Sequence, residues 1–495
     1  MAVTSGSITT TRTFEAGDEL FAFIPSAAIN KNMRDFTRPS FEINQYYLLD
    51  GELNYSEVKI GGEWKTVLVG SMGTAGAPPN GSPAVFALDV TNPGNPKLLW
   101  EKTAPAMGQT MGRPVIAPVG DGKWSVFIGS GPNQSVSESK SAVLQIDLAT
   151  GNVTTLQGGD MGTSNKAGIL GLHVVDTDRD NYADTIYAGD LAGNVWKISN
   201  VDGKAAGGAR YTKLFRASRA ITSPLTSTVD KSGVRWLFFG TGQALTDDDL
   251  TDKQTQHVWY GIQDTDAEVK DNELVSRSYT VVQVQRNSLS APEDAVVMNY
   301  AADGDMDGKK GWKIPLNQSG DRANPGYMVL QSRIRNGLLV GQMNFSANNE
   351  PSCEGLETSS RLMVLDPFTG SVSSSNTFGN IDVNDDGEVD EKDLYGGSGS
   401  SGGGSTGGGN GPLPIVGLKF GDGELSGSIL IVQEQRTKAG SGGGSGVSGD
   451  PKPDIESTRT CALDARGRRV CLPPDPEGTP PSKHSWVELR NDDAP

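Results

Sequence analysis

The sequence has 495 residues, including 64 Gly and 27 Pro, and its formal net charge at pH 7 is −17. Such an acidic surface repels phosphate backbones and anionic lipid headgroups, which argues against nucleic-acid binding and against binding to anionic membranes. No run approaches the ~18 apolar residues that a membrane-spanning helix needs, so no transmembrane segment is predicted.

The N-terminal segment 1–16 is polar and rich in Thr and Ser, and we expect it to be a disordered stretch or the end of a linker. It has neither the charged start nor the apolar stretch of a signal peptide. We therefore expect the chain to be part of a longer secreted protein.

From residue 19 to about 370 the sequence repeats one pattern. A short run of Val, Ile, Phe, Trp and Tyr is followed by a Gly-rich turn and by a second run that ends in an acidic turn. Runs bounded in this way are typical of β-strands, and the near absence of a 3.6-residue apolar period predicts few helices. The paired runs are 64–72 with 84–100, 124–131 with 142–156, 184–190 with 193–201, 234–242 with 258–264, and 337–345 with 361–372.

Repeats of roughly 40–50 residues with several strands each are typical of β-propeller blades. One four-stranded blade cannot bury both of its faces, whereas blades stacked in a ring cover each other. Asp89, Asp147, Asp190 and Asp366 each stand at the turn that follows a strand. Because Asp at such places bonds nearby backbone N–H groups, we interpret these four as turn caps and not as active-site residues.

An acidic loop precedes the run 184–190. Asp176, Asp178, Asp180 and Asp184 occupy positions 1, 3, 5 and 9 of the loop, and Tyr182 stands at position 7. A calcium loop supplies side-chain oxygens from these positions and a backbone carbonyl from position 7. Four carboxylates this close repel one another, and a divalent ion removes that cost. The sequence therefore predicts a calcium site here, with a solvated acidic turn as the alternative.

This loop differs from a full EF-hand. Asn181 takes the sharp turn at position 6, where Gly is usual, and Asn is among the few other residues that tolerate a positive φ. Position 12 is Tyr187 instead of Glu, and the loop leads into a strand instead of a helix.

A second loop, at 382–393, has Gly387 at the turn position and oxygen ligands at positions 1, 3, 5, 9 and 12. It predicts a further calcium site, with an acidic linker as the alternative. A third acidic stretch, Asp303 to Gly308, lacks a ligand at position 9 and is interpreted as a plain turn. The predicted ligands of the second loop are Asp382, Asn384, Asp386, Glu388 through its carbonyl, Asp390 and Asp393.

After this loop the chain contains two Gly-rich stretches, at 396–411 and 440–453, which are predicted to be flexible. The segment 415–435 between them is expected to be a pair of strands. Cys461 and Cys471 flank a turn-like stretch, so a hairpin disulfide is expected in an oxidising compartment, with two free thiols as the alternative. Cys353 has no evident partner.

No nucleophile, P-loop, dinucleotide or zinc motif accompanies the three histidines His173, His257 and His484. Together, the stretches GDELFAFIPS, WKTVLVGSMGTAG, AVFALDVTNP, DTDRDNYADTIYAGDLAGNVWKIS and SRLMVLDPFTG resemble the C-terminal domain of PilY/PilC-type proteins, the type IV pilus tip adhesins and biogenesis factors. The resemblance covers about residues 15–440, and its most specific element is the acidic loop with the strands that follow.

The resemblance implies an all-β, modified quinoprotein-like β-propeller of about seven blades, with calcium held by the loop at 176–184. It implies a calcium-regulated role in pilus extension and retraction, with pilins, the pilus assembly and a host-cell or abiotic surface as partners. The location it implies is the pilus tip, the outer membrane or cell surface, or the secreted state, reached through the periplasm. We expect this chain to be a fragment without the signal peptide and N-terminal domain of such proteins. We expect a linker at 1–16, a propeller at 17–440, and a tail at 441–495 with a docked strand.

The main alternative is an enzyme, a periplasmic dehydrogenase of the quinoprotein class, because the stretch 87–100 resembles the blade-docking motif of that class. Such enzymes show a vicinal Cys-Cys pair near the quinone, and this chain has none. The docking motif also serves a structural purpose, the packing of a Trp between blades. We therefore predict a non-enzymatic interaction module. A dockerin-like module at 382–393 is also weighed, but a dockerin needs two such loops in tandem.

Overall fold

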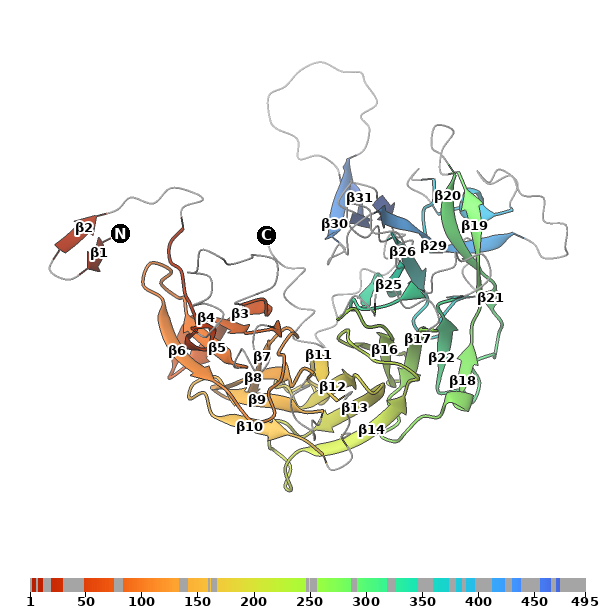
Figure 1. The fold of residues 1–495 in the computed structure, drawn as a ribbon. Helices are drawn as coiled ribbons and strands as arrows, with labels where there is room; N and C mark the ends of the chain where they lie inside the picture. Colours follow the sequence, from red (N-terminus) through yellow and green to blue (C-terminus); the bar gives the residue numbers. More distant parts are fainter. Residues whose placement is uncertain are drawn as a thin grey trace, which may run out of the picture. The chain divides into compact units, whose positions relative to one another are not determined.

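In the computed structural model, short β-strands follow one another along the chain (Figure 1). The chain forms two compact units. The first comprises Met1–Leu225, Asp266–Glu268 and Lys483–Pro495, and the second Thr226–Thr265 and Val269–Ser482. The residues that the structure describes are 2–5, 8–11, 19–29, 49–74, 83–132, 141–158, 161, 167–245, 249, 256–285, 292–317, 326–345, 359–373, 380–384, 389–396, 412–422, 430–437, 455–463 and 469–471.

The first unit contains three antiparallel four-stranded sheets, in which each strand pairs with the next one along the chain. Tight turns make this possible. Gly61 and Gly62, with φ of 61° and 88°, connect the first two strands of the first four-stranded sheet. They adopt the positive φ that a two-residue hairpin turn requires. The sheets are β3 (Leu53–Ile60), β4 (Glu63–Ser71), β5 (Val85–Asp89) and β6 (Lys97–Lys102); β7 (Val115–Gly120), β8 (Lys123–Gly129), β9 (Val143–Asp147) and β10 (Val153–Leu156); and β11 (Ile169–Val175), β12 (Thr185–Asp190), β13 (Asn194–Ser199) and β14 (Arg210–Arg216).

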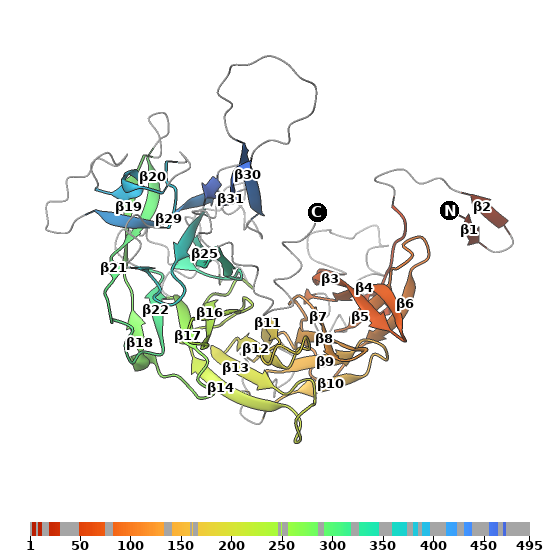
Figure 2. The ribbon, with the colours of Figure 1, turned by 180° about the vertical axis from the view of Figure 1, so that it is seen from behind.

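Apolar side chains between these sheets form the core of the first unit. Val67 and Val69 of β4 belong to one buried cluster with Val126 and Ile128 of β8. A second cluster joins β7–β10 to β11–β14, and all seven residues of β11 are buried. The strands of β7–β10 and β11–β14 lie beside each other in both ribbon views (Figures 1 and 2). Each sheet therefore covers a face of its neighbour, as the repeat pattern predicts.

The second unit has larger sheets. A five-stranded sheet has the order β15-β16-β17-β22-β18, and an eight-stranded sheet is built around β19-β20-β29-β26-β25-β23, with β24 beside β25 and β28 beside β29. The strands are β15 (Thr226–Val229), β16 (Arg235–Gly240), β17 (Val258–Gln263), β18 (Leu274–Ser276), β19 (Tyr279–Val284), β20 (Glu293–Met298), β22 (Gly311–Pro315), β23 (Gly326–Tyr327), β24 (Arg333–Arg335), β25 (Leu338–Phe345), β26 (Ser359–Leu365), β28 (Leu394–Tyr395) and β29 (Leu413–Asp422).

Smaller elements complete the description. The sequence predicts a strand pair over 415–435, and strands do form there, but they belong to different sheets: β29 pairs with β20 and β26, whereas β30 pairs with β31. The prediction of their mutual pairing is therefore wrong for the described residues, because each strand pairs with other partners.

The remaining described elements are β1 (Ala2–Ser5) with β2 (Ile8–Thr11), β21 (Tyr300–Ala301) with β27 (Val372–Ser373), β30 (Leu430–Thr437) with β31 (Ile455–Leu463) and β32 (Arg469–Cys471), and the 3₁₀ helices η1 (Ser26–Ala28), η4 (Asp271–Glu273) and η5 (Glu391–Asp393).

A tryptophan of one sheet is bound by a turn of the next sheet. The indole Nε1 of Trp100 on β6 donates to the Leu148 carbonyl at 2.9 Å, in the turn after β9. Gly151 of that turn has φ of 71°, and an added Cβ there would lie 2.8 Å from Trp100 Cγ. The carboxylate of Asp147 accepts the Thr150 N–H at 2.8 Å and so shapes the turn. The predicted roles of Asp147 as a turn cap and of the docking motif as a structural device are thus confirmed.

The second unit repeats this arrangement. Trp312 on β22 donates its Nε1 to the Pro367 carbonyl at 2.8 Å, and Asp366 caps the turn through the N–H groups of Phe368 and Thr369, both at 2.9 Å. Gly370 has φ of 68°, and a Cβ there would lie 2.3 Å from Trp312 Cδ2. Because Trp312 is fully buried, the carbonyl that accepts its indole proton cannot be replaced by bulk water.

We predict that Gly370→Ala lowers the stability of the second unit more than Gly308→Ala does. Both glycines have nearly the same φ, 68° and 69°, but nothing lies within 4 Å of a Cβ at Gly308. The left-handed conformation alone costs a residue with a Cβ roughly 1–2 kcal/mol. The clash with Trp312 adds roughly 1–3 kcal/mol of overpacking. Denaturant titration of both variants measures the difference, and equal losses of stability would contradict the proposed Trp–Gly contact.

We also predict a disulfide between Cys461 and Cys471. The two residues are direct partners in the antiparallel pairing of β31 with β32. Directly opposite residues of an antiparallel pair have Cα atoms roughly 4.5–5.5 Å apart, within the roughly 4.4–6.8 Å that a disulfide spans. Oxidation of both thiols by a disulfide donor, with transfer of two electrons to that donor, would form the bond. Mass spectrometry of a digest without reduction should find the two peptides linked, and alkylation of both thiols in the oxidised protein would refute the bond.

Candidate metal centre

The first acidic loop connects the first two strands of a four-stranded sheet. Asp176 directly follows β11 and Asp184 directly precedes β12, and the strands close below the loop with Val175 paired to Thr185. The Asp184 N–H donates to the Val175 carbonyl at 3.1 Å. The hairpin register therefore places the first and ninth loop positions side by side.

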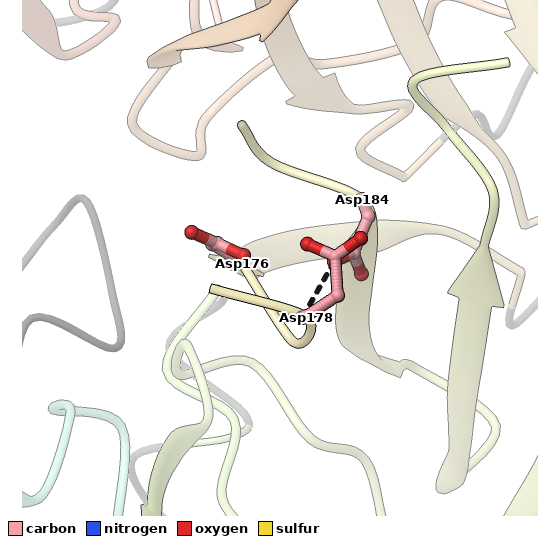
Figure 3. A group of neighbouring side chains, drawn as sticks. All are labelled: Asp176, Asp178 and Asp184. Carbon is pink, nitrogen blue, oxygen red and sulfur yellow. Dashed lines mark hydrogen bonds between the residues drawn. The ribbon is translucent and has the colours of Figure 1, made fainter. Parts of the chain in front are cut away.

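Three carboxylates of the loop come together (Figure 3). Asp176, Asp178 and Asp184 each offer an oxygen, and these oxygens all lie within 4.8 Å of one another. Asp176 and Asp184 are buried, at 7% and 8% exposure, whereas Asp178 is exposed. The cluster is thus open to solvent on one side, through which an ion can enter.

Backbone N–H groups surround Asp176. Its Oδ1 accepts the Arg179 N–H at 2.6 Å, and its Oδ2 accepts the Asn181 N–H at 2.7 Å. Arg179 and Asn181 have φ of 66° and 71°, which bends the loop around the carboxylate. The positive φ of Asn181 agrees with the turn expected at position 6.

Asp184 closes the loop from its other end. Its Oδ2 accepts the Thr177 N–H at 2.7 Å and the Asp178 N–H at 3.3 Å. Its Oδ1 accepts the hydroxyls of Thr177 at 2.7 Å and Thr185 at 2.5 Å. Asp184 is therefore an organiser of the loop as well as a candidate ligand.

The fourth predicted carboxylate, Asp180, lies outside the group of three. Its Oδ1 accepts the Tyr182 N–H at 2.9 Å, and its Oδ2 contacts the ammonium group of Lys204. That ammonium group also lies 4.9 Å from the centroid of the Tyr182 ring. The ligand roles of Asp180 and of the Tyr182 carbonyl stay predictions.

Sequence reasoning missed Asp202, in the turn after β13. Its side chain is 4% exposed, and its Oδ2 lies 3.3 Å from Lys204 Nζ. The pairing of Thr185 with Ser199 brings the end of β13 beside Asp184, and the Val201 N–H donates to the Asp184 carbonyl at 3.0 Å. Because this proximity comes from strand pairing, the loop spacing contains no signal of it.

The carboxylates destabilise one another's charge. Burial raises the pKa of Asp176 above its ordinary value. The Asn181 and Arg179 N–H groups oppose this rise, and Asp178 adds to it. Burial also raises the pKa of Asp202; the Lys204 N–H opposes this rise, and the charges of Asp184 and Asp178 increase it. A cation among these oxygens would remove the repulsion.

The donor set fits a hard divalent cation. The loop offers carboxylate oxygens, with no His or Cys among the three clustered residues. Flexible all-oxygen loops favour Ca²⁺ over Zn²⁺, which takes N and S ligands, and over Mg²⁺, which demands near-ideal octahedral geometry. When bound, the ion would supply charge neutralisation and would crosslink the loop.

The second loop is described in part. Asp382 and Asp393 are both 1% exposed, and burial raises the pKa of Asp393, with the charge of Asp382 adding to the rise. Asp393 Oδ1 accepts the N–H groups of Val383 at 2.7 Å and Asn384 at 3.3 Å. The Asp393 carboxylate thus accepts the N–H groups of the second and third loop residues, as the Asp184 carboxylate does in the first loop.

Among the other predicted ligands of this loop, one is paired with a lysine and two lie outside the described residues. Asp390 Oδ2 forms an ion pair with Lys392 at 2.8 Å, and its Oδ1 accepts the Lys392 N–H at 2.8 Å. Asp386 and Glu388 lie outside the described residues. The structure therefore places Asp393 beside the start of the loop, and the ligand roles of the residues of this loop stay predictions.

An arginine neutralises the third acidic stretch. Arg277 binds both carboxylate oxygens of Asp305, at 2.5 and 3.1 Å, and its Nε donates to the Thr369 carbonyl at 2.8 Å. This hydrogen-bonded arginine lowers the pKa of Asp305. The contacts agree with the interpretation of this stretch as a turn.

The chain is similar to proteins named as type IV pilus biogenesis factors. A type IV pilus biogenesis factor PilY1 homologue of Xylella fastidiosa is 31% identical over 366 residues, which are 72% of this chain and 28% of that protein. The type IV pilus biogenesis factor PilY1 of Pseudomonas aeruginosa is 29% identical over 426 residues, 77% of this chain and 35% of that protein. The chain thus spans about a third of the length of these relatives.

The crystal structure of the Pseudomonas aeruginosa PilY1 C-terminal domain has a similar fold, with a TM-score of 0.66 and 23% identity, over 94% of this chain and 90% of that one. This similarity confirms the predicted propeller-type fold. No helix of the described residues is long and apolar enough to cross a membrane.

The family model of the PilY1 beta-propeller domain matches residues 9–301, more than half of the chain. The prediction of the PilY/PilC family is thereby confirmed, and with it the prediction of a non-enzymatic protein, since this is a family of pilus biogenesis factors. The chain belongs to the PilY1 β-propeller domain family.

Proposed function

We propose that this chain is a calcium-regulated interaction domain of a type IV pilus biogenesis protein. Calcium occupancy of its loops controls how the domain contacts pilins and the pilus assembly, and through them pilus extension, retraction and surface adhesion. The observation that carries the proposal is the group of three carboxylates, within 4.8 Å of one another, in a chain whose relatives are named as pilus biogenesis factors.

The first loop is built into the junction of two sheets, which supports a structural role for the ion. The Ala183 N–H donates to the Pro118 carbonyl of β7 at 2.8 Å, and the Asp184 carbonyl accepts from Val201 beyond β13. An ion that fixes the loop would therefore also fix the adjoining surface of β7–β10 and β11–β14. Loss of the ion would loosen that surface and weaken the binding of a partner to it.

The location and the partners follow from the same proposal. A protein of this kind acts at the pilus tip or cell surface after passage through the periplasm, and it contacts host cells or abiotic surfaces there. The enzymatic alternative, a quinoprotein dehydrogenase, has no support in the described residues, where the docking-motif tryptophan Trp100 packs on a turn.

We predict that Asp178→Asn weakens calcium binding at the first loop without unfolding the protein. Asp178 is exposed and its carboxylate accepts one backbone N–H, from Asp180 at 3.3 Å, whereas Asp184 also organises the loop. Loss of one ligand charge should weaken calcium binding roughly tenfold or more, since the charge count of the ligands sets the affinity of such loops.

Isothermal titration calorimetry and metal analysis of the purified chain test this prediction. Asp121→Asn, at the exposed turn between β7 and β8, is the control because it makes the same charge change away from the loop. In the full-length protein, Asp178→Asn should reduce surface piliation and twitching motility in calcium-containing medium. Unchanged calcium stoichiometry and affinity would refute the assignment of the first loop.

We further predict that the second loop binds its own ion. Asp382→Asn keeps the shape of a buried side chain and removes one charge. It should lower the calcium stoichiometry by one and leave the first loop unaffected, and the double variant with Asp178→Asn should lose the second ion and bind the first one roughly tenfold more weakly or worse. If the Asp382→Asn variant kept the calcium stoichiometry of the wild type, 382–393 would be an acidic turn without an ion.

A further inference from the structure

A lysine next to the first loop binds a carboxylate that the loop pattern assigns to calcium. The ammonium group of Lys204 contacts Asp180 Oδ2 and lies 3.3 Å from Asp202 Oδ2. It also lies 4.9 Å from the centroid of the Tyr182 ring, which adds a cation–π attraction. Lys204 is 44% exposed, so its side chain has room to move away.

A well-defined turn holds Lys204 in this position. Asn200, with φ of 62°, donates its Nδ2 to the Ala205 and Gly208 carbonyls, both at 2.8 Å. The Ala205 N–H returns a bond to Asn200 Oδ1 at 2.8 Å. The backbone around Lys204 is therefore fixed from both sides, and only its flexible four-carbon side chain needs to move when the ammonium group leaves.

In this structure Asp180 is a partner of the lysine and not a member of the carboxylate group that would hold the ion. Its Oδ1 accepts a backbone N–H and its Oδ2 contacts Lys204, while the oxygens of Asp176, Asp178 and Asp184 form the compact group without it. A divalent ion among these oxygens would repel an ammonium group a few ångströms away, because solvent screens charges weakly over such a distance.

We propose that Lys204 is a built-in competitor of the divalent cation at the first loop. In the absence of the ion, Lys204 offsets part of the negative charge of Asp180 and Asp202 and keeps the acidic loop folded. When a divalent cation binds, Lys204 releases Asp180 and stays near Asp202, so Asp180 joins the other ligands. The lysine thereby raises the calcium concentration at which the loop fills. This inference deepens the proposed function and depends on it.

Lys204→Gln tests the competition, because Gln has a long polar side chain without the charge. The probe is calcium alone, titrated calorimetrically into the full chain in the Asp382→Asn background, so that only the first loop is read. Removal of the competing charge should tighten calcium binding roughly five- to tenfold. The thermal midpoint in chelator should fall, and the midpoint in saturating calcium should stay unchanged.

Asp202→Asn should act in the opposite direction. It removes a charge near the ion and leaves Lys204 with Asp180 as its carboxylate partner, so both effects weaken calcium binding. Lys213→Gln is the matched control, since Lys213 pairs with Glu268 at 3.1 Å on the same sheet and its loss changes the net charge equally. It should leave the calcium affinity as in the wild type.

The outcomes separate the two proposals. If Asp178→Asn lowers the affinity but Lys204→Gln leaves it equal or weaker, the competition is refuted and the calcium site stands. If Lys213→Gln tightens binding as much as Lys204→Gln does, a general charge effect replaces the competition. If the Asp382→Asn variant without any further change binds no calcium, both proposals fail.

Discussion

The first loop depends on one constraint, which is that carboxylates crowded at the end of a hairpin need positive partners. Backbone N–H groups supply part of this, because the left-handed residues Arg179 and Asn181 direct theirs at Asp176. Lys204 supplies another part at Asp180. Burial raises the pKa of Asp176 and the neighbouring Asp178 adds to the rise, so part of the cost of the charge is left for a bound cation to offset.

Aspartate has a different role elsewhere in the chain. Asp147 and Asp366 also follow strands, but their carboxylates accept hydrogen bonds from N–H and hydroxyl groups of their own turns. Those turns then bind Trp100 and Trp312 through a carbonyl and a glycine. An Asp with nearby donors shapes a turn, whereas several Asp residues that face one another form a candidate ion site.

Local features were readily predicted from the sequence. The strands, the turn caps and the spacing of Asp176, Asp178 and Asp184 depend on residues close together in the chain, and the fold brings these three carboxylates together as expected. Lys204 and Asp202 escaped prediction because the pairing of β12 with β13 brings their turn beside the loop. The partners of β29 escaped for the same reason, since each strand run indicates a strand without indicating its neighbour.

The position of β29 affects how the chain can fold as it is made. In the first unit each sheet uses strands that follow one another, so each can form soon after its own segment emerges. In the second unit β29 (Leu413–Asp422) lies between β20 (Glu293–Met298) and β26 (Ser359–Leu365). Those two strands must wait for a segment synthesised much later. Until then their unpaired edges are open to association with other chains, which makes this sheet the place where a chaperone would protect the growing protein.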